Sequence, residues 1–414
     1  MLTLKGRSLL FWTLAAIPPV AALALIFGYG VNAPFFDDFL SPGELLIKSA
    51  RGELSFGDLF AQHNEHRVLF PRLVFLALAR GGWNPRSQML ASWVAACLIA
   101  WNVFRLRQRG AGLAGSAAAL ISGVLIFSPL QYQNWTFAMQ LMMFLPMLCV
   151  TSCLVALRSG MDWRAKLGCC FAAALVSTFS AGSGMLCWAA AIPALLWTDW
   201  TDRSNKRVAL GVWLGGCAAC AAIYFVGYSK PATGSLSFAL DEPARALYWS
   251  LLFLGSPLAW ATEPIAAIAS AAAVAACGWL AWRTARADWN AAMPWIIIAL
   301  YTLGVAASAT LARGADGPGQ ALSARYVTLS IYLLVALVNL AGLWISQGGS
   351  RALGPICLAA VLGAHLFACW RAAPWIEQFW RDRRYGRACI VWSGIARNGC
   401  LNVVSGLPRH CPQA

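Results

Sequence analysis

The sequence predicts an all-α polytopic membrane protein. The chain has 414 residues, of which 60% are hydrophobic and only 11% are charged, and its mean hydropathy is +0.63. A soluble protein of this length would carry about a quarter charged residues. Apolar runs of roughly twenty residues, the length that an α-helix needs to cross a bilayer, recur from end to end. The runs are continuous rather than alternating, which does not fit a membrane β-barrel.

Taken in order, the apolar runs predict about eleven membrane-spanning helices. They lie at about 9–28, 87–104, 112–127, 139–157, 167–179, 185–197, 208–227, 265–282, 295–311, 327–345 and 352–370. Two further runs, 68–80 and 247–260, are short and are interrupted by proline. An apolar stretch of that length is more typical of an interfacial or re-entrant helix than of a spanning one. We therefore expect short re-entrant or interfacial helices between the spans.

The distribution of positive charge orients the predicted helices. The net charge is +15, and Lys and Arg in membrane proteins collect in cytoplasmic loops. No basic patch with interleaved aromatic residues indicates a nucleic-acid partner. The basic turns that we place in the cytoplasm are 105–109, 158–166, 203–207 and 283–286.

With the amino terminus inside, this orientation divides the chain into a membrane domain and a short tail. Residues 1–371 form a single transmembrane domain, and 31–86 form its first outer loop, which we expect to contain helical segments. Residues 372–414 form an outer tail. Its three cysteines are Cys389, Cys400 and Cys411. In an oxidising compartment two of them could form a disulfide, and free thiols are the equally expected alternative.

The most polar stretch before the tail, residues 32–67, is predicted to carry the chemistry. It holds six of the sixteen acidic residues and two of the four histidines. Asp37 and Asp38 are adjacent just beyond the first helix, and one of them could take the proton from an acceptor hydroxyl as a general base. Its neighbour, through like-charge coupling, would raise the basicity of the pair. The alternative is a solvated turn after Pro34.

The same stretch ends in QHNEHR at 62–67. The residues that could hold a phosphate or sugar hydroxyls are His63, Asn64, Glu65, His66 and Arg67. If the segment is helical, His63 and Arg67 share one face, as do Gln62 and His66. The alternative is an interfacial helix whose polar face meets water. The histidines could also bind a divalent cation together with an aspartate, but the spacing does not establish a metal site.

A late polar loop adds cations to the predicted outer side. It contains Arg313, Arg325 and Tyr326. Arginine binds phosphate with a planar fork of donors. Arginines on the outer side run against the positive-inside tendency, so they are more informative than those inside. The alternative is an anchor for lipid headgroups.

Amides and an aromatic ring gather in a third outer segment. The candidates for contacts with the acceptor or a sugar are Gln131, Gln133, Asn134, Trp135 and Gln140. Aromatic rings next to amides suit sugar binding. They equally suit the aromatic belt at a membrane interface, which we favour for this segment taken alone.

Four short motifs in this order resemble the GT-C superfamily of polyprenyl-phosphate-sugar-dependent glycosyltransferases. They are FFDDF at 35–39, QHNEHR at 62–67, QYQNW at 131–135 and SARY at 323–326. The chain looks most like a bacterial branch that modifies O-antigen or pilin. The resemblance implies an undecaprenyl-type lipid-phosphate sugar donor and transfer, usually inverting, at the periplasmic face of the bacterial inner membrane.

The resemblance also implies roles for particular residues. The family's first-loop aspartate maps to Asp37 or Asp38, and its phosphate-binding arginines map to Arg313 or Arg325. Some members use a divalent metal, and we expect none here. Many members carry a large soluble domain after the helices, whereas about forty residues follow them in this sequence. This favours a glycan or lipid-linked acceptor, or a partner protein, over a peptide sequon.

Two other functions remain open on the sequence. A lipid-linked-sugar flippase or small transporter would often show an internal repeat, which we do not find convincingly. An O-antigen polymerase or ligase also uses outer arginines but would not need the early acidic pair.

Overall fold

The computed structural model describes residues 4–107, 112–198, 203–229 and 236–393 and is almost entirely helical. Within these residues, nine helices are long and apolar enough to cross a membrane, which supports a multi-pass membrane protein. They are α1 (Leu4–Tyr29), α5 (Pro85–Leu106), α6 (Gly112–Ile126), α8 (Leu141–Leu157), α11 (Arg203–Phe225), α14 (Glu263–Ala287), α15 (Trp289–Arg313), α18 (Tyr332–Ser346) and α19 (Leu353–Ser393). Three of them, α6, α8 and α18, reach spanning length together with the short helical turns that adjoin them.

The described helices of spanning length are fewer than the eleven expected because two predicted spans are short. Helix α9 (Trp163–Thr178) has 16 residues and α10 (Leu186–Trp197) has 12. At 1.5 Å per residue the longer one covers about 24 Å, less than the roughly 30 Å of a hydrocarbon core. The two interrupted runs also form short helices, α4 (Leu69–Leu78) and α13 (Pro243–Gly255), in agreement with the prediction that they are too short to span.

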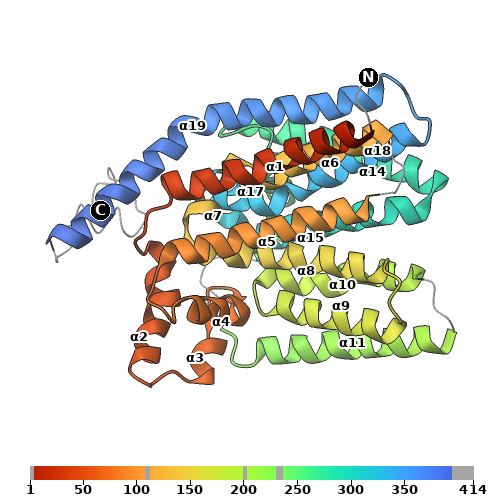
Figure 1. Ribbon diagram of the computed structural model, residues 1–414. Coiled ribbons are helices and arrows are strands. Elements are labelled where there is room, and N and C mark those ends of the chain that lie inside the picture. The colour runs from red at the N-terminus through yellow and green to blue at the C-terminus, as the bar shows by residue number, and fades with distance from the viewer. Residues whose placement is uncertain (1–3, 108–111, 199–202, 230–235, 394–414) are drawn as a thin grey trace.

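The long helices run side by side (Figure 1). Basic turns meet at one end. There Nη1 of Arg158 donates to the carbonyl of Asn290 at 2.9 Å, and the rings of Trp197 and Trp289 lie 4.8 Å apart. The first loop lies at the opposite end, where it packs against α4 (Figure 1). The turn at Arg158 and the first loop therefore lie at opposite ends of the bundle.

Helix α18 lies at the centre of the bundle and α1 at its edge. In the segment containing α18, 89% of the apolar window is buried inside the protein, against 11% for α1. A helix that is apolar all round and buried belongs to a core, whereas one with the same composition and high exposure faces lipid. The centre is pinned by a hydrogen bond from Nδ2 of Asn339 to Oγ of Ser122 at 2.8 Å.

The first loop is made of short elements. They are η1 (Phe36–Phe39), η2 (Leu40–Glu44), α2 (Leu45–Ala50), α3 (Phe56–Phe60), β1 (Gln62–His63) and β2 (His66–Arg67). The helical reading of QHNEHR is wrong, because β1 and β2 form an antiparallel hairpin that pairs Gln62 with Arg67 and His63 with His66. Asn64 turns the chain with a φ of 49°, a conformation that asparagine tolerates better than most residues.

The segment that carries the predicted sugar contacts, from Gln131 to Gln140, lies in a series of buried helical turns. These are η3 (Pro129–Gln131), α7 (Tyr132–Thr136) and η4 (Ala138–Gln140). The remaining short elements are η5 (Gly182–Met185), α12 (Leu236–Asp241), η6 (Gly314–Asp316), α16 (Pro318–Ala321) and α17 (Ala324–Ser330).

The last helix is longer than expected. Helix α19 has 41 residues and continues through Pro374, so the predicted boundary between 371 and 372 falls inside it. Its later turns extend past the end of the bundle that carries the first loop (Figure 1). Cys400, Cys411 and the side chain of Cys389 lie outside the described residues.

Candidate active site

A cavity of about 530 Å³ opens at the end of the bundle that carries the first loop. Its volume falls in the range of about 300–1,000 Å³ that is usual for small-molecule sites. Nine of the predicted site residues line it: Asp37, His63, Asn64, Glu65, His66, Gln140, Arg313, Arg325 and Tyr326. They come from η1, the hairpin, η4, the end of α15 and α17, so the fold gathers residues that are up to 289 positions apart in the chain (Asp37 to Tyr326).

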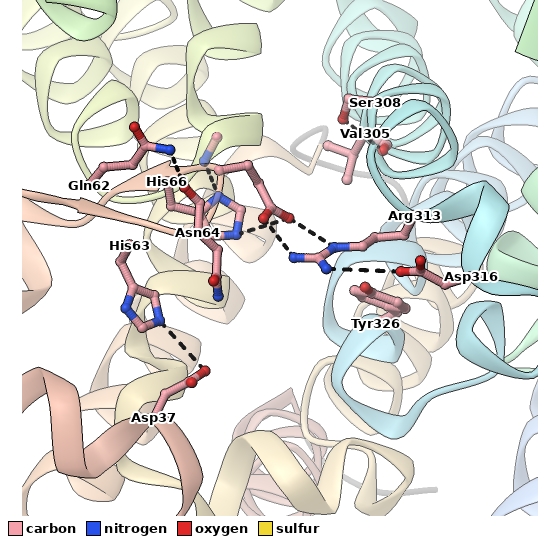
Figure 2. Close-up of polar contacts among 12 residues, drawn as sticks. Asp37, Gln62, His63, Asn64, His66, Val305, Ser308, Arg313, Asp316 and Tyr326 are labelled. Carbon is pink, nitrogen blue, oxygen red and sulfur yellow. Dashed lines mark hydrogen bonds and ion pairs between the residues drawn. The ribbon is translucent and has the colours of Figure 1, made fainter. Parts of the chain in front are cut away.

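Asp37 and His63 form one wall of the cavity. Oδ2 of Asp37 lies 3.5 Å from Nε2 of His63, and the Asp37 side chain is 23% exposed. Figure 2 shows the pair across an opening from Arg313 and Tyr326. A carboxylate next to an imidazole, open to a cavity, is suited to accept a proton from a bound hydroxyl.

Asp38 does not line the cavity, although it was predicted to have the same role as Asp37. It is fully buried, and its two oxygens accept hydrogen bonds from the backbone N–H groups of Phe35 and Met139, both at 3.0 Å. Burial raises the pKa of Asp38 to about 7, while the charge of Arg383 and the two N–H donors act to lower it. The acidic pair therefore divides into one cavity residue and one structural residue.

Glu65 and Arg313 join the hairpin tip to the end of α15. Arg313 donates from Nε to Oε1 at 3.2 Å and from Nη2 to Oε2 at 2.6 Å, a two-pronged contact. Burial acts to raise the pKa of Glu65, but the neighbouring His66 and Arg313 lower it below its usual value, so Glu65 is a carboxylate. Arg313 was predicted to bind phosphate, but an internal carboxylate already engages its guanidinium.

His66 is held as a neutral ring with a defined tautomer. The backbone N–H of Gly182 donates to its Nδ1 at 2.9 Å, so the proton of the neutral ring sits on Nε2, which lies 3.6 Å from Oε1 of Glu65. Burial lowers the pKa of His66 to about 4. A Cβ on residue 182 would lie 3.0 Å from Nδ1, so glycine permits this approach. Within the described residues, no three His, Cys, Asp or Glu side chains group closely enough to hold a metal ion.

Arg325 lines the cavity without an anionic partner in the described chain. Its Nε is buried and makes no hydrogen bond, and its guanidinium carbon lies 5.7 Å from the ring centroid of Tyr326. A guanidinium left in this state has its full capacity to bind an anion. Of the two predicted phosphate-binding arginines, the geometry favours Arg325.

Arg67 is a structural residue rather than a ligand. Its Nε donates to the carbonyl of Tyr224 at 3.1 Å, and its terminal nitrogens donate to the carbonyls of Phe60 and Val226. The side chain is 5% exposed and does not line the cavity. It fastens the hairpin to the end of α11, so the prediction that it holds phosphate does not fit its position.

The amides of the QYQNW segment support α17 from outside the cavity. Nδ2 of Asn134 donates to Oγ1 of Thr328, which donates to Oε1 of Gln131, both at 2.5 Å. Trp135 is buried and donates from Nε1 to the carbonyl of Ser128 at 2.9 Å. Gln133 also lies outside the lining, so only Gln140 remains of the five predicted sugar contacts.

The sequence reading missed the apolar part of the cavity. Four of the chain's nine methionines line it: Met139, Met142, Met143 and Met185. The cluster MQLMM at 139–143 was the available signal, since flexible thioethers fit apolar groups of varied shape. A second hollow of about 260 Å³ follows along α10 and α15, lined by Leu186, Ala189, Ala190, Pro193, Ile297, Leu300, Tyr301 and Gly304. Leu300 is 56% exposed on the outer surface of the bundle, so this hollow lies at the lipid-facing side.

Comparisons with protein-family models, with curated proteins and with solved structures gave no match to this chain. The functional conclusion therefore rests on the geometry of the cavity.

Proposed function

We propose that the protein is a membrane glycosyltransferase that moves a monosaccharide from a polyprenyl-phosphate donor to an acceptor hydroxyl. One observation carries the proposal: a carboxylate beside an imidazole shares a cavity with a guanidinium that has no anionic partner in the described chain. The first pair suits removal of a proton from a hydroxyl, and the guanidinium suits a phosphate leaving group.

In the proposed reaction Asp37 accepts the proton of the acceptor hydroxyl as its oxygen attacks the anomeric carbon. A new carbon–oxygen bond forms there, and the bond to the phosphate oxygen breaks. The lipid phosphate leaves with the electron pair, and Arg325 stabilises the charge that develops on it. A single displacement of this kind inverts the anomeric centre. His63 holds the Asp37 carboxylate, and Asn64, Glu65 and Gln140 are candidates for sugar hydroxyls.

The second hollow supports a lipid-linked rather than a soluble donor. It adjoins the polar cavity, since Leu186 and Gly304 lie next in sequence to the cavity residues Met185 and Val305. A lipid chain in this hollow would place its phosphate at the cavity without leaving the bilayer. The basic turns at the other end of the bundle favour a periplasmic cavity in a bacterial inner membrane. The acceptor in the proposal is a glycan, a lipid-linked group or a protein.

The test is transfer from labelled donors by membranes that contain the full-length protein. The donors are undecaprenyl phosphates carrying a labelled hexose or pentose, and the products are labelled acceptor and free undecaprenyl phosphate. We expect Asp37→Asn to reduce transfer by at least about 100-fold, the usual contribution of a general base. Binding of undecaprenyl phosphate should be unchanged.

Glu53→Gln is the matched control, because Glu53 is an exposed acid in the same loop. It should transfer sugar at the wild-type rate. Full activity of Asp37→Asn would refute the proposed base. Donor movement across the bilayer without any bond cleavage, equal in wild type and variant, would instead identify a flippase.

A further inference from the structure

The last described helix reaches back to the loop that carries Asp37. Arg383 of α19 is only 4% exposed. Its Nη1 donates to the carbonyl of Thr136 at 2.8 Å, and its Nη2 donates to the carbonyl of Ala33 at 3.0 Å. Its guanidinium carbon lies 4.4 Å from the ring centroid of Phe35. One side chain thus contacts residues 33–35, the segment that leads directly into η1.

Asp38 stabilises the same loop through hydrogen bonds to the backbone. It accepts from the N–H of Phe35, on one side of Asp37, and from the N–H of Met139 in the cavity floor. Arg383 is the cation whose charge acts on this buried carboxylate. Removal of the cation would leave a buried charge without compensation, which proteins do not tolerate well.

The inward turn of Arg383 is specific to this position on α19. Its neighbours Arg381 and Arg384 are exposed; Arg381 pairs with Glu377, and Arg384 lies over the ring of Trp380 at 4.8 Å. The helix therefore carries one arginine that binds the loop among others that face outward.

We propose that Arg383 is a positioning residue for Asp37, which it holds in place through residues 33–35 and through Asp38. The inference rests on the proposed function, because Asp37 is the base of that reaction. Without Arg383, the backbone carbonyls of Thr136, Val31 and Ala33 lose this donor, and Asp38 loses its compensating charge. The carboxylate of Asp37 then moves relative to the bound hydroxyl. A misplacement of about 1 Å can cost about 100-fold in rate.

The experiment compares four full-length proteins in lipid nanodiscs: wild type, Arg383→Gln, Arg383→Lys and Arg384→Gln. Three quantities are measured. They are amide hydrogen exchange across residues 31–40, binding of undecaprenyl phosphate, and transfer from the labelled donors. Arg384→Gln is the matched control, since it makes the same change one residue along the helix, on an exposed side chain.

For Arg383→Gln we expect faster exchange across 31–40, lipid-phosphate affinity within twofold of wild type, and a loss of turnover of about 100-fold. Arg383→Lys keeps the charge and should recover part of both exchange protection and turnover. Arg384→Gln should match wild type throughout. The exchange data test the positioning role of Arg383 separately from the proposed glycosyl transfer. They report on the order of the loop even if none of the proteins turns over a donor.

Wild-type exchange across 31–40 in Arg383→Gln would overturn the inference. So would equal losses of binding and turnover in both Arg383 variants, which would indicate general misfolding rather than positioning. The double variant Asp38→Asn/Arg383→Gln removes the buried charge together with its partner. It should fold at least as well as Arg383→Gln alone, and a lower thermal unfolding midpoint would also contradict the pairing.

Discussion

Replacement of Arg325 by glutamine tests which arginine binds the lipid phosphate. Arg325 lines the cavity with a buried Nε that has no hydrogen-bond partner, whereas Arg313 is engaged by both oxygens of Glu65. A hydrogen bond to a charged group contributes about 1.5–3 kcal/mol, and about 1.4 kcal/mol changes affinity tenfold. One such bond to phosphate therefore predicts that Arg325→Gln weakens binding by about 10- to 100-fold. Arg313→Gln should weaken it by less, because Glu65 already neutralises that guanidinium.

The assay is equilibrium binding of farnesyl phosphate, a short lipid phosphate, to the purified protein in nanodiscs. Farnesol measures the contribution of the phosphate, since it has the same chain and no charge. Arg245→Gln is the control for net charge, because Arg245 is exposed, paired with Glu242 and outside the cavity. Farnesol should bind wild type and Arg325→Gln equally. If Arg325→Gln binds farnesyl phosphate as wild type does, or Arg313→Gln has the larger effect, the assignment of the phosphate site is wrong.

Two further predictions concern the frame of the site. A Cβ on Gly184 would lie 1.7 Å from the carbonyl oxygen of Ser177, so Gly184→Ala should cost about 1–3 kcal/mol of stability and lower the thermal midpoint. Gly168→Ala is the control, because a Cβ there would have nothing within 4 Å, and it should leave the thermal midpoint unchanged. Burial raises the pKa of Asp38 to about 7, so the folded protein binds this proton more tightly than the unfolded chain. The stabilisation from this proton is complete below about pH 4 and is lost as the pH rises through 7. Thermal midpoints from pH 5 to 8 should therefore fall more in wild type than in Asp38→Asn, and parallel curves would contradict this.

The helical class was predictable because it depends on composition and on the length of apolar runs. The spans at α5, α14 and α15 begin and end within several residues of their predicted limits. Helices α9 and α10 were predicted to span the membrane and are too short to do so. Apolar content alone does not separate a full span from a shorter helix packed inside the protein, since both are equally hydrophobic.

Within the site, residue types were predictable and their roles were not. Asp37 and Asp38 are chemically identical neighbours, and they differ only in the direction of their side chains. Asp37 lines the cavity, whereas Asp38 is buried and accepts hydrogen bonds from two backbone N–H groups. Arg67 has the composition of an anion ligand, but three backbone carbonyls accept its hydrogen bonds. Sequence supplies the donors, whereas their acceptors are backbone atoms that the chain brings near only after folding.

The hairpin shows the same limit at the level of local structure. A helical pattern fits QHNEHR by spacing alone, but the positive φ of Asn64 reverses the chain and pairs His63 with His66 across two strands. His63 and His66 are therefore cross-strand partners, and both line the cavity.

The contact between Arg383 and Ala33 also has a consequence for biosynthesis. The two residues are 350 positions apart, so the ribosome has made nearly the whole chain before the first loop can take its final form. Helices inserted early must wait for α19 to enter the membrane. A nascent chain that stalls or is cut before residue 383 would hold most of its helices and still lack the finished loop.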